Sequence, residues 1–235
     1  MTQTERLPRI GVLANADSWY FHDLERAGRG LASVERLEFS ALQSRIGGRE
    51  SISADSVLSD RFDAVIVRTM PPGSLEQVVF RMDALAALER QGVLIVNRPK
   101  SMEMAIDKYL SLSRLAEAGF RVPETHVCQT WQDAMAAFEQ LGPSVVVKPI
   151  FGGEGRGILR VDDADLAHRV FKTLQQLGQV IYLQKFISHP GANATPEPIP
   201  GEVAEVALRA VETLDLTIAG LDFLPDGQGG WYLLE

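Results

Sequence analysis

A glycine-rich segment between two apolar runs holds the residues of this chain that are best suited to binding phosphate. Val145-Val146-Val147 leads into Lys148, four glycines follow up to Gly157, and Ile158 to Val161 is largely apolar again. β-Branched runs separated by glycines predict a β-hairpin. A backbone without Cβ atoms can approach an anion closely and donate several N–H bonds, and Lys148 adds a positive charge nearby. The segment therefore predicts a flap that folds over the phosphates of a nucleotide.

Two familiar glycine-rich phosphate sites do not fit this segment. In the Walker loop the lysine follows the glycines and opens a helix, whereas here Lys148 comes first and a strand follows. The dinucleotide fingerprint also requires a helix after its glycines, and Ile158 to Val161 reads as extended. A surface hairpin without a ligand remains the alternative, because glycine also supplies hairpin turns.

Asp222 and Glu235 are candidates for binding a metal ion. Asp222 interrupts an apolar run over residues 218–224, Glu235 ends another over 231–235, and Pro225 to Gly229 contains turn residues. We therefore expect an antiparallel hairpin with a carboxylate on each strand. Mg²⁺ typically takes one or two carboxylates together with substrate phosphates. The alternative is an Asp satisfied within the sheet and an exposed Glu.

Two further positions have weaker signals. Lys108 lies within an expected helix, where a lone lysine is usually solvated. Residues 184–187 (Gln-Lys-Phe-Ile) end an expected strand whose backbone could pair with the edge of a base. An ordinary amphipathic strand end explains the second pattern equally well.

Arg68 follows the third expected strand, at the edge where ligands gather in open α/β sheets. Its guanidinium can bind a substrate carboxylate through two parallel hydrogen bonds, or it can pair with a neighbouring acid.

Trp19-Tyr20 and His22 follow the first expected strand. They are consistent both with a ligand edge and with a helix start that packs on the core, and we assign them no role.

Composition narrows the class of protein. The 235 residues include 23 basic and 31 acidic side chains, for a formal charge of −8, and no basic run stands out, which argues against a nucleic-acid surface. The single cysteine, Cys128, excludes an intramolecular disulfide and argues against a cysteine metal site. No apolar run approaches the ~20 residues needed to span a bilayer, and no signal peptide is visible. We expect a soluble cytoplasmic protein with no nucleic-acid or membrane partner.

Strand and helix signals alternate up to residue 98, which predicts a mostly parallel sheet covered by helices. Pro99 then separates this lobe from one long helix that ends before Gly119. The expected strands are 10–14, 34–39, 64–67, 93–96, 125–128, 180–187, 217–224 and 230–235, besides the glycine-rich hairpin. The expected helices are 21–31, 74–90 with Ser74 as N-cap, 102–118, 131–141, 164–177 and 201–214.

Four segments in order resemble the ATP-grasp superfamily and, within it, the RimK-like glutamate ligases. They are "DKYLSLSRLAEAGFRVPET", "VVVKPIFGGEGRGI", "YLQKFISHPG" and "GLDFLP…GWYLLE". The resemblance implies an α/β protein with α+β lobes: a Rossmann-like pre-ATP-grasp domain over residues 1–98, followed by a two-lobed ATP-grasp domain. Its N-terminal lobe, with the flap, would cover 99–187, and its C-terminal lobe 188–235, which looks incomplete.

The resemblance also implies roles for individual residues. Lys108 and Lys148 would contact the α- and β-phosphates of ATP, Gln184 would meet the adenine amino group, and backbone groups of Lys185 and Ile187 would pair with the base edge. The flap residues expected to close over the phosphates are Gly152, Gly153, Gly155, Arg156 and Gly157.

The remaining implied roles concern the metal and the reaction. Asp222 and Glu235 would hold Mg²⁺ or Mn²⁺. ATP would phosphorylate a carboxylate, and an amine, most simply that of glutamate, would attack the acyl phosphate to give an amide. The acceptor could be a protein C-terminus, a peptide or a pterin-like cofactor tail. Arg68 remains the candidate substrate residue from its position after the third expected strand, and the resemblance adds nothing to it. Another amino acid as donor and a homo-oligomer are both left open.

Two departures from the family pattern matter. The family places further strands with an Asp-x-Arg element after "HPG", whereas Gly191 here runs into Ala192 to Pro196, and the family continues past Glu235 to a nearby Asn. We expect the sequence to join pieces of a longer protein; continuous Cα spacing of ~3.8 Å over residues 189–197 would contradict this. If the segments are truly absent, a nucleotide-binding regulatory or interaction module without ligase activity is the alternative.

Overall fold

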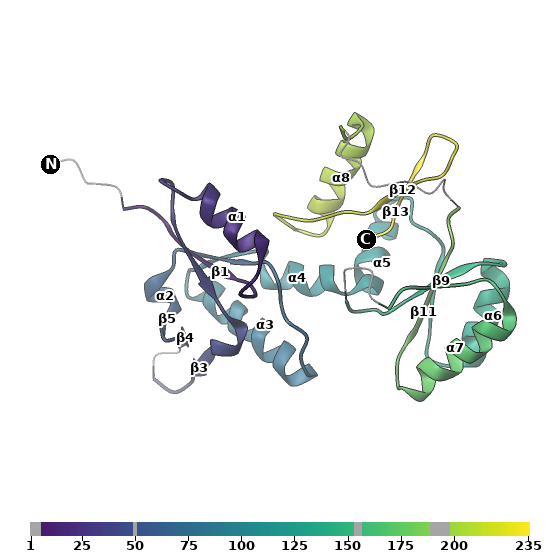
Figure 1. The fold of residues 1–235 in the computed structure, drawn as a ribbon, viewed down its shortest axis with the longest axis horizontal. Coiled ribbons are helices and arrows are strands. Elements are labelled where there is room, and N and C mark those ends of the chain that lie inside the picture. The colour runs from purple at the N-terminus through teal and green to yellow at the C-terminus, as the bar shows by residue number, and fades with distance from the viewer. Residues whose placement is uncertain (1–5, 49–50, 153–156, 189–197) are drawn as a thin grey trace. The chain divides into compact units, whose positions relative to one another are not determined.

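The computed structural model describes residues 6–48, 51–152, 157–188 and 198–235 (Figure 1). Two compact units divide the chain: Met1–Glu103 with Leu216–Ile218, and Met104–Asp215 with Ala219–Glu235. Asn97 explains why the short segment belongs to the first unit. Its Nδ2 donates to the carbonyl of Ile218 (2.7 Å), and its Oδ1 accepts from the backbone N–H groups of Thr217 (2.8 Å) and Ile218 (2.9 Å).

The first unit is built on a four-stranded sheet in which every neighbouring pair is parallel, with the order β2-β1-β6-β7. Its strands are β1 (Arg9–Leu13), β2 (Ser33–Leu37), β6 (Ala64–Val67) and β7 (Leu94–Val96). Helices α1 (Trp19–Ala27) and α3 (Leu75–Arg90) lie on opposite faces of this sheet (Figure 1). This follows from two right-handed crossovers that run in opposite directions along the sheet. The parallel sheet expected from the alternating pattern is confirmed.

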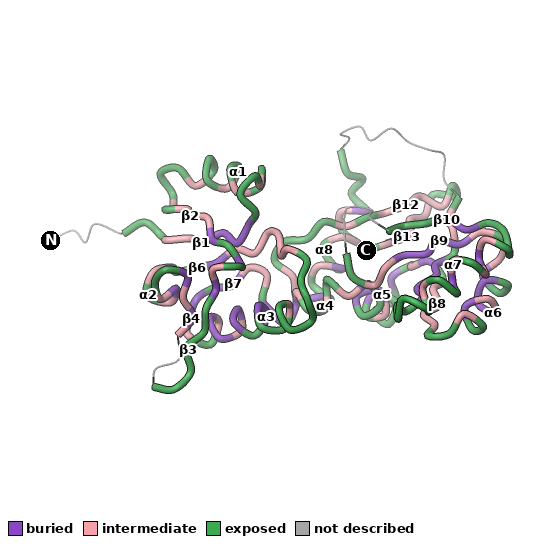
Figure 2. The backbone as a smooth tube through the Cα atoms, turned by 60° about the horizontal axis from the view of Figure 1, so that its bottom comes forward, coloured by how far each residue is buried: buried purple, intermediate pink, exposed green. Residues whose placement is uncertain are grey.

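The two helices cover the sheet unequally. Leu85 and Leu88 of α3 are fully buried and belong to the same core cluster as Val65 and Ile95 of the sheet. Helix α1 has no buried residue, and Figure 2 shows it as mostly exposed, whereas one side of α3 is buried. Ser74 caps α3 through a reciprocal capping box with Gln77, which confirms the predicted N-cap. The core of this unit therefore lies on the α3 face of the sheet.

A small antiparallel sheet and two short helical segments in this unit were not predicted. They are β3 (Gln43–Arg45), β4 (Ser51–Ala54), β5 (Ser56–Val57), η1 (Phe39–Ala41) and α2 (Leu58–Arg61). The strands are short and rich in serine, so their sequence resembles a loop. Ile52, Ala54 and Leu58 are nevertheless buried in the core, which holds this region in place.

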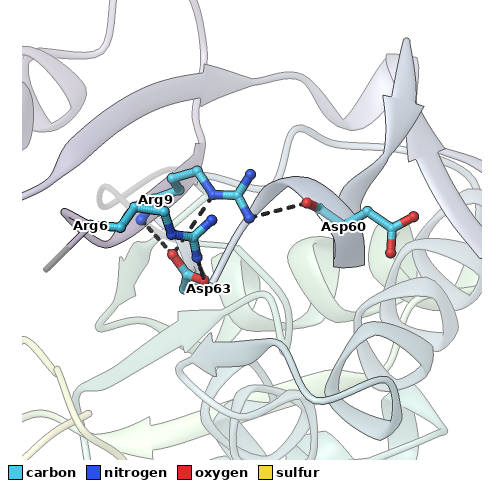
Figure 3. Close-up of polar contacts among 4 residues, drawn as sticks. All are labelled: Arg6, Arg9, Asp60 and Asp63. Atoms are coloured by element: carbon cyan, nitrogen blue, oxygen red, sulfur yellow. Dashed lines mark hydrogen bonds and ion pairs between the residues drawn. The ribbon is translucent and has the colours of Figure 1, made fainter. Parts of the chain in front are cut away.

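Arginines at the amino end of the parallel sheet are matched by acceptors. Figure 3 shows Asp63 accepting hydrogen bonds from Arg6 Nη2 (2.6 Å) and from the backbone N–H of Arg9 (2.7 Å). Arg9 Nη2 also donates to the carbonyl of Asp60 (3.1 Å). The backbone hydrogen bond from Arg9 is the main reason that the pKa of Asp63 lies below its ordinary value.

The second unit contains a four-stranded antiparallel sheet with the order β10-β9-β11-β8. The strands are β8 (Thr125–Cys128), β9 (Val145–Lys148), β10 (Leu159–Val161) and β11 (Ile181–Lys185). Helices α6 (Trp131–Leu141) and α7 (Ala164–Gln176) share one buried core with this sheet. Strands β9 and β10 pair as the glycine-rich hairpin predicted from the sequence, and that prediction is confirmed.

The expectation of one long helix over residues 102–118 is wrong. The segment forms α4 (Pro99–Ile106) and α5 (Lys108–Glu117). The chain breaks at Asp107, whose Oδ1 accepts from the backbone N–H groups of Tyr109 (2.9 Å) and Leu110 (3.0 Å) and so caps α5. Pro99 begins α4 rather than preceding a later helix, which agrees with the tolerance of the first helical turn for proline.

The second unit is completed by α8 (Gly201–Thr213) and a hairpin of β12 (Phe223–Pro225) and β13 (Trp231–Leu233). Both strands of the hairpin are shorter than the expected 217–224 and 230–235. In the part of the chain that the structure describes, no helix combines the length and the apolar character needed to cross a bilayer.

Candidate functional site

Lys148 and Gln184 lie on the same face of the antiparallel sheet. Val145 and Val147 of β9 are in the core beneath α6 and α7, so the alternating side chains of that strand point to the opposite face. Tyr182 pairs with Lys148, and Gln184 pairs with Val146, which places them on that opposite face too. Lys148 is 8% exposed and Gln184 2%. This face therefore carries polar side chains that are almost fully removed from solvent.

Lys108 reaches the same region from α5. The break at Asp107 makes Lys108 the first residue of α5, and its backbone N–H donates to the carbonyl of Ile150 (3.2 Å), just beyond β9. Its Nζ donates to the carbonyl of Gly152 and forms an ion pair with Glu235 Oε2 at 3.2 Å. Only 9% of Lys108 is exposed, so the alternative of a solvated helical lysine is wrong.

The charges around Lys148 show that four ionisable groups share this region. Burial is the main reason that the pKa of Lys148 is lowered, because removal from water disfavours the ammonium. The negative charges of Glu235 and Asp222 oppose this shift, and the positive charge of Lys108 adds to it. Two lysines and two carboxylates are thus close enough to influence one another.

Asp222 and Glu235 lie opposite each other at the open end of the β12–β13 hairpin, where the strand pairing is irregular. The backbone N–H of Asp222 donates to the carbonyl of Glu235 (2.9 Å), while its carbonyl accepts from the N–H of Leu234 (2.8 Å). One residue therefore opposes two, which is the pattern of a β-bulge. In a regular ladder Asp222 would face Leu234, and the side chain of Glu235 would point to the other face. A bulge allows the side chains of Asp222 and Glu235 to lie on the same face of the hairpin.

A clasp that the sequence reading missed anchors this hairpin to the rest of the unit. Arg121 pairs with Asp226, its guanidinium lies 4.3 Å from the centre of the Tyr232 ring, and its carbonyl accepts from the N–H of Leu233 (2.9 Å). Asp226 Oδ1 also accepts from the N–H groups of Gln228 (2.8 Å) and Gly230 (2.9 Å). These backbone bonds, followed by Arg121, keep the pKa of Asp226 below its ordinary value. The sequence offers no signal for this contact beyond the presence of Arg121 shortly after the end of α5.

Thr125 orients Gln184 and was also missed. Gln184 Nε2 donates to Thr125 Oγ1 (3.0 Å), and Thr125 in turn donates to the carbonyl of Pro123 (2.9 Å). Tyr182, beside them, is almost fully buried, and burial raises its pKa to about 12. The backbone N–H of Lys185 donates to the carbonyl of Glu124 (2.8 Å), so this donor is already used within the sheet. A threonine that begins a strand carries no recognisable signal in one sequence.

The two ends of the flap fit the expectation for a glycine loop. Gly152 and Gly157 have φ values of +122° and +77°, a region that disfavours side chains with a Cβ. Gly153, Gly155 and Arg156 lie outside the described residues, as does the segment 189–197 on which the expectation of a joined sequence depends.

Arg68 belongs to the first unit, where it follows β6. Its guanidinium lies 4.3 Å from the centre of the Tyr20 ring. The structure thus gathers Lys108, Lys148, Gln184, Asp222 and Glu235 within the second unit, and describes Arg68 with the first.

The residues present fit a hard divalent cation bound together with a phosphate. Asp222 and Glu235 offer carboxylate oxygens, which Mg²⁺ prefers. Among the described residues no group of three or more His, Cys, Asp or Glu could hold a metal, so such an ion would need oxygens from its ligand. The two lysines supply the positive charge that a polyphosphate requires.

Comparisons with known proteins agree with this geometry. Residues 105–195 match the RimK-like ATP-grasp domain. The chain is similar to the tetrahydromethanopterin:alpha-L-glutamate ligase of Methanosarcina acetivorans, with 37% identity over 150 residues that cover 59% of this chain and 46% of that protein. It is also similar to a probable alpha-L-glutamate ligase of Mannheimia succiniciproducens, with 30% identity over 132 residues, 56% of this chain and 43% of the relative. The chain spans less than half the length of these relatives.

Solved structures share the fold over nearly the whole chain. A RimK domain protein of ATP-grasp type from Sphaerobacter thermophilus superposes with a TM-score of 0.73 at 22% identity, covering 96% of this chain and 89% of that one. The ATP-grasp ligase PsnB, solved with its precursor peptide PsnA2 and AMPPNP, gives 0.70 at 16% identity, covering 100% and 90%. These likenesses agree with the resemblance seen in the sequence: this chain has the ATP-grasp ligase fold, and its residues 105–195 match the RimK-like ATP-grasp domain.

Proposed function

We propose that this protein is an ATP-dependent carboxylate–amine ligase that forms an amide bond through an acyl phosphate, with L-glutamate as the amine. The observation that carries the proposal is the convergence of two buried lysines and two carboxylates on one face of an ATP-grasp sheet. The names of the similar proteins support glutamate as the added amino acid.

In this proposal the two lysines bind the α- and β-phosphates of ATP, and Gln184 recognises the adenine. Because Gln184 Nε2 is engaged by Thr125, its Oε1 is the atom that accepts from the adenine amino group. The N–H of Lys185 is bonded to Glu124, so its carbonyl and the N–H of Ile187 are the backbone groups that pair with the base. Thr125 acts as a positioning residue for Gln184.

Asp222 and Glu235 hold Mg²⁺ in the same proposal. When bound there, Mg²⁺ would supply positive charge against the transferring phosphoryl group. The ion pair between Lys108 and Glu235 then stabilises the nucleotide-free site, because each group is the counter-ion of the other until nucleotide and metal bind together. On binding, Lys108 exchanges Glu235 for phosphate, and its bond to the Gly152 carbonyl is released with it.

The acceptor is a carboxylate on a protein C-terminus, a peptide or a cofactor tail, and Arg68 is the proposed substrate residue. The structure of PsnB with a precursor peptide supports a peptide-like acceptor, and the relative named tetrahydromethanopterin:alpha-L-glutamate ligase supports a cofactor tail. A nucleotide-binding module without turnover is the second candidate, because the sequence that follows Gly191 does not contain the Asp-x-Arg element that the resemblance leads us to expect.

The test measures ATP binding and ADP release separately. The chain is incubated with Mg²⁺, ATP, glutamate and one acceptor at a time. The ligase proposal predicts ADP release that requires both glutamate and an acceptor, together with a product heavier by one glutamyl group. ATP binding without any such turnover would favour the binding module. For variants of Lys108 or Lys148, Lys172→Ala is a matched control. Lys172 lies on α7, on the other side of the sheet, and stacks on Trp131.

A further inference from the structure

The first unit has a topological switch point between β1 and β6. Strands β1 and β6 are neighbours, but the chain leaves β1 toward β2 on one side and leaves β6 toward β7 on the other. In open α/β sheets ligands bind just beyond the carboxyl ends of the strands at such a point. The segment after β6 begins against the last residue of β1, because the N–H groups of Arg68 (3.0 Å) and Thr69 (3.4 Å) both donate to the carbonyl of Leu13.

Arg68 is oriented at this point but has no carboxylate partner. Its guanidinium lies 4.3 Å from the centre of the Tyr20 ring, and among the described residues no carboxylate forms an ion pair with it. Arginines at the amino end of the sheet do have carboxylate partners, because Arg6 pairs with Asp63 and Arg61 pairs with Glu35. A guanidinium held by a ring keeps its fork of N–H donors free for a carboxylate.

An exposed aromatic stack adjoins this arginine. Trp19 and Tyr20 begin α1 directly after the loop that follows β1, with ring centres 4.0 Å apart and planes 30° apart. Trp19 is 65% exposed, and α1 contains no buried residue. The alternative that these rings pack on the core is therefore wrong. A large exposed indole that contacts the same tyrosine ring as Arg68 offers a flat ligand a stacking surface.

We propose that Arg68, Tyr20 and Trp19 form a binding site for a planar aromatic ligand that carries a carboxylate. Arg68 binds the carboxylate, and the outer face of Trp19 stacks on the ring. The inference deepens the proposed function, on which this part rests, because it names the chemical class of the acceptor. The site itself is formed within the first unit.

Isothermal titration of the nucleotide-free chain tests this site with three probes. Folic acid has a fused aromatic ring and a glutamate tail, pterin is its ring alone, and glutarate resembles its tail alone. We expect folic acid to bind and each fragment to bind about 10-fold more weakly or worse, because each loses one of the two contacts. Arg68→Ala should weaken folic acid binding about 10-fold or more, and Trp19→Ala about 3-fold to 10-fold.

Arg68→Lys and Arg61→Ala sharpen the result. Arg68→Lys keeps the charge but loses the planar fork, so its affinity should fall between those of the wild type and Arg68→Ala. Arg61 also lies over an aromatic ring, that of Phe62 at 5.0 Å, but at the amino end of the sheet, so Arg61→Ala should bind folic acid like the wild type. Unchanged thermal unfolding of the Arg68 variants shows that the fold is intact.

Two outcomes would overturn the inference: no binding of folic acid at millimolar concentration, or binding that Arg68→Ala and Trp19→Ala leave unchanged. ATP titrations of the same proteins keep this result separate from the proposed function. If ATP binding requires Lys148 while folic acid does not bind, only the aromatic site is refuted. If folic acid binding requires Arg68 but no ADP is ever released, the ligase proposal fails and the site stands.

Discussion

The cations of the lysine region (Lys108 and Lys148) and of the Arg68 region are stabilised in different ways. Lys108 and Lys148 are 9% and 8% exposed, and the carboxylates of Glu235 and Asp222 act on them. Arg68 is only half-buried, lies over the Tyr20 ring and has no ion-pair partner among the described carboxylates. Buried ammonium groups need counter-ions from the protein, because removing them from water is unfavourable. A delocalised guanidinium against a ring does not, because it is more weakly hydrated.

The difference predicts how each region responds to its ligand. In the proposed function, a phosphate that binds at the lysines would replace Glu235 as the partner of Lys108, so binding would require an existing ion pair to rearrange. Binding of a carboxylate at Arg68 adds an anion where none was paired. Variants of Lys108 or Lys148 should therefore change both the stability of the fold and ligand binding, whereas variants of Arg68 should change ligand binding alone.

The largest effect is expected for Lys148→Met. Losing a charged hydrogen bond to phosphate should weaken ATP binding about 10-fold to 100-fold. The same change removes a buried charge, so the melting temperature should rise by about 2–4 °C for each ~1 kcal/mol gained. Calorimetric titration and thermal unfolding measure the two effects. Arg68→Ala is the comparison, with unchanged ATP affinity and unchanged stability. A Lys148→Met variant that melts earlier than the wild type would contradict the comparison between the regions.

The pH dependence of stability follows from the same lysine. Because the folded pKa of Lys148 is lowered, its burial destabilises the fold fully below that pKa. The effect fades as pH rises toward the ordinary value of 10.5, since the unfolded chain then binds more protons than the folded one. The stability advantage of Lys148→Met should accordingly shrink as pH approaches that value.

A smaller, two-sided effect is expected for Glu235→Gln. Without Mg²⁺ the variant should bind ATP about 2-fold to 5-fold more tightly, because Lys108 is released from a partly exposed ion pair. With Mg²⁺ present it should bind more weakly, and the Mg²⁺ concentration at half-effect should rise about 10-fold, the loss typical of a disturbed metal site. ATP titrations with and without Mg²⁺ measure both. Glu117→Gln, which removes an exposed acid of α5 paired with Arg114, should change neither. Equal shifts in the two conditions would refute the exchange of partners.

The smallest effect is expected for Asp226→Asn, which weakens the clasp without touching the proposed site. The variant should melt at a slightly lower temperature near neutral pH, because Arg121 and two backbone N–H groups lose a charged acceptor. The folded pKa of Asp226 is lowered, so this contribution is present above its ordinary value of 3.8 and is lost as pH falls below it. Melting curves from pH 7 down to pH 3 should therefore converge. Asp162→Asn, at an exposed aspartate, should show no such trend.

The sequence predicted local structure well where the pattern within a segment was decisive. Thr125–Cys128 and Trp131–Leu141 have the bounds expected from their periodicity, and the glycine-rich hairpin pairs as predicted. Elsewhere competing local signals misled the interpretation. The apolar periodicity of residues 102–118 concealed the break at Asp107, because an aspartate inside a helical pattern does not reveal that its side chain caps the next helix.

The sequence suggested the individual candidate site residues, but it did not indicate which of them contact one another. Sequence order cannot show that Lys108 meets Glu235, that Thr125 holds Gln184, or that Arg121 clasps Asp226. Each pair joins residues that are far apart along the chain, and no local pattern specifies such a contact.

The sequence by itself determined the ATP-grasp type, the hairpins and the residue types that could bind a phosphate and a metal, because turns, strands and glycine loops depend on neighbouring residues. Only the tertiary structure decided that both lysines are buried, that a bulge sets Glu235 opposite Asp222, and that Arg68 stacks on Tyr20 at a switch point. Burial and charge pairing arise when distant segments pack together, and it is packing that changes a solvated lysine into a group whose charge must be balanced.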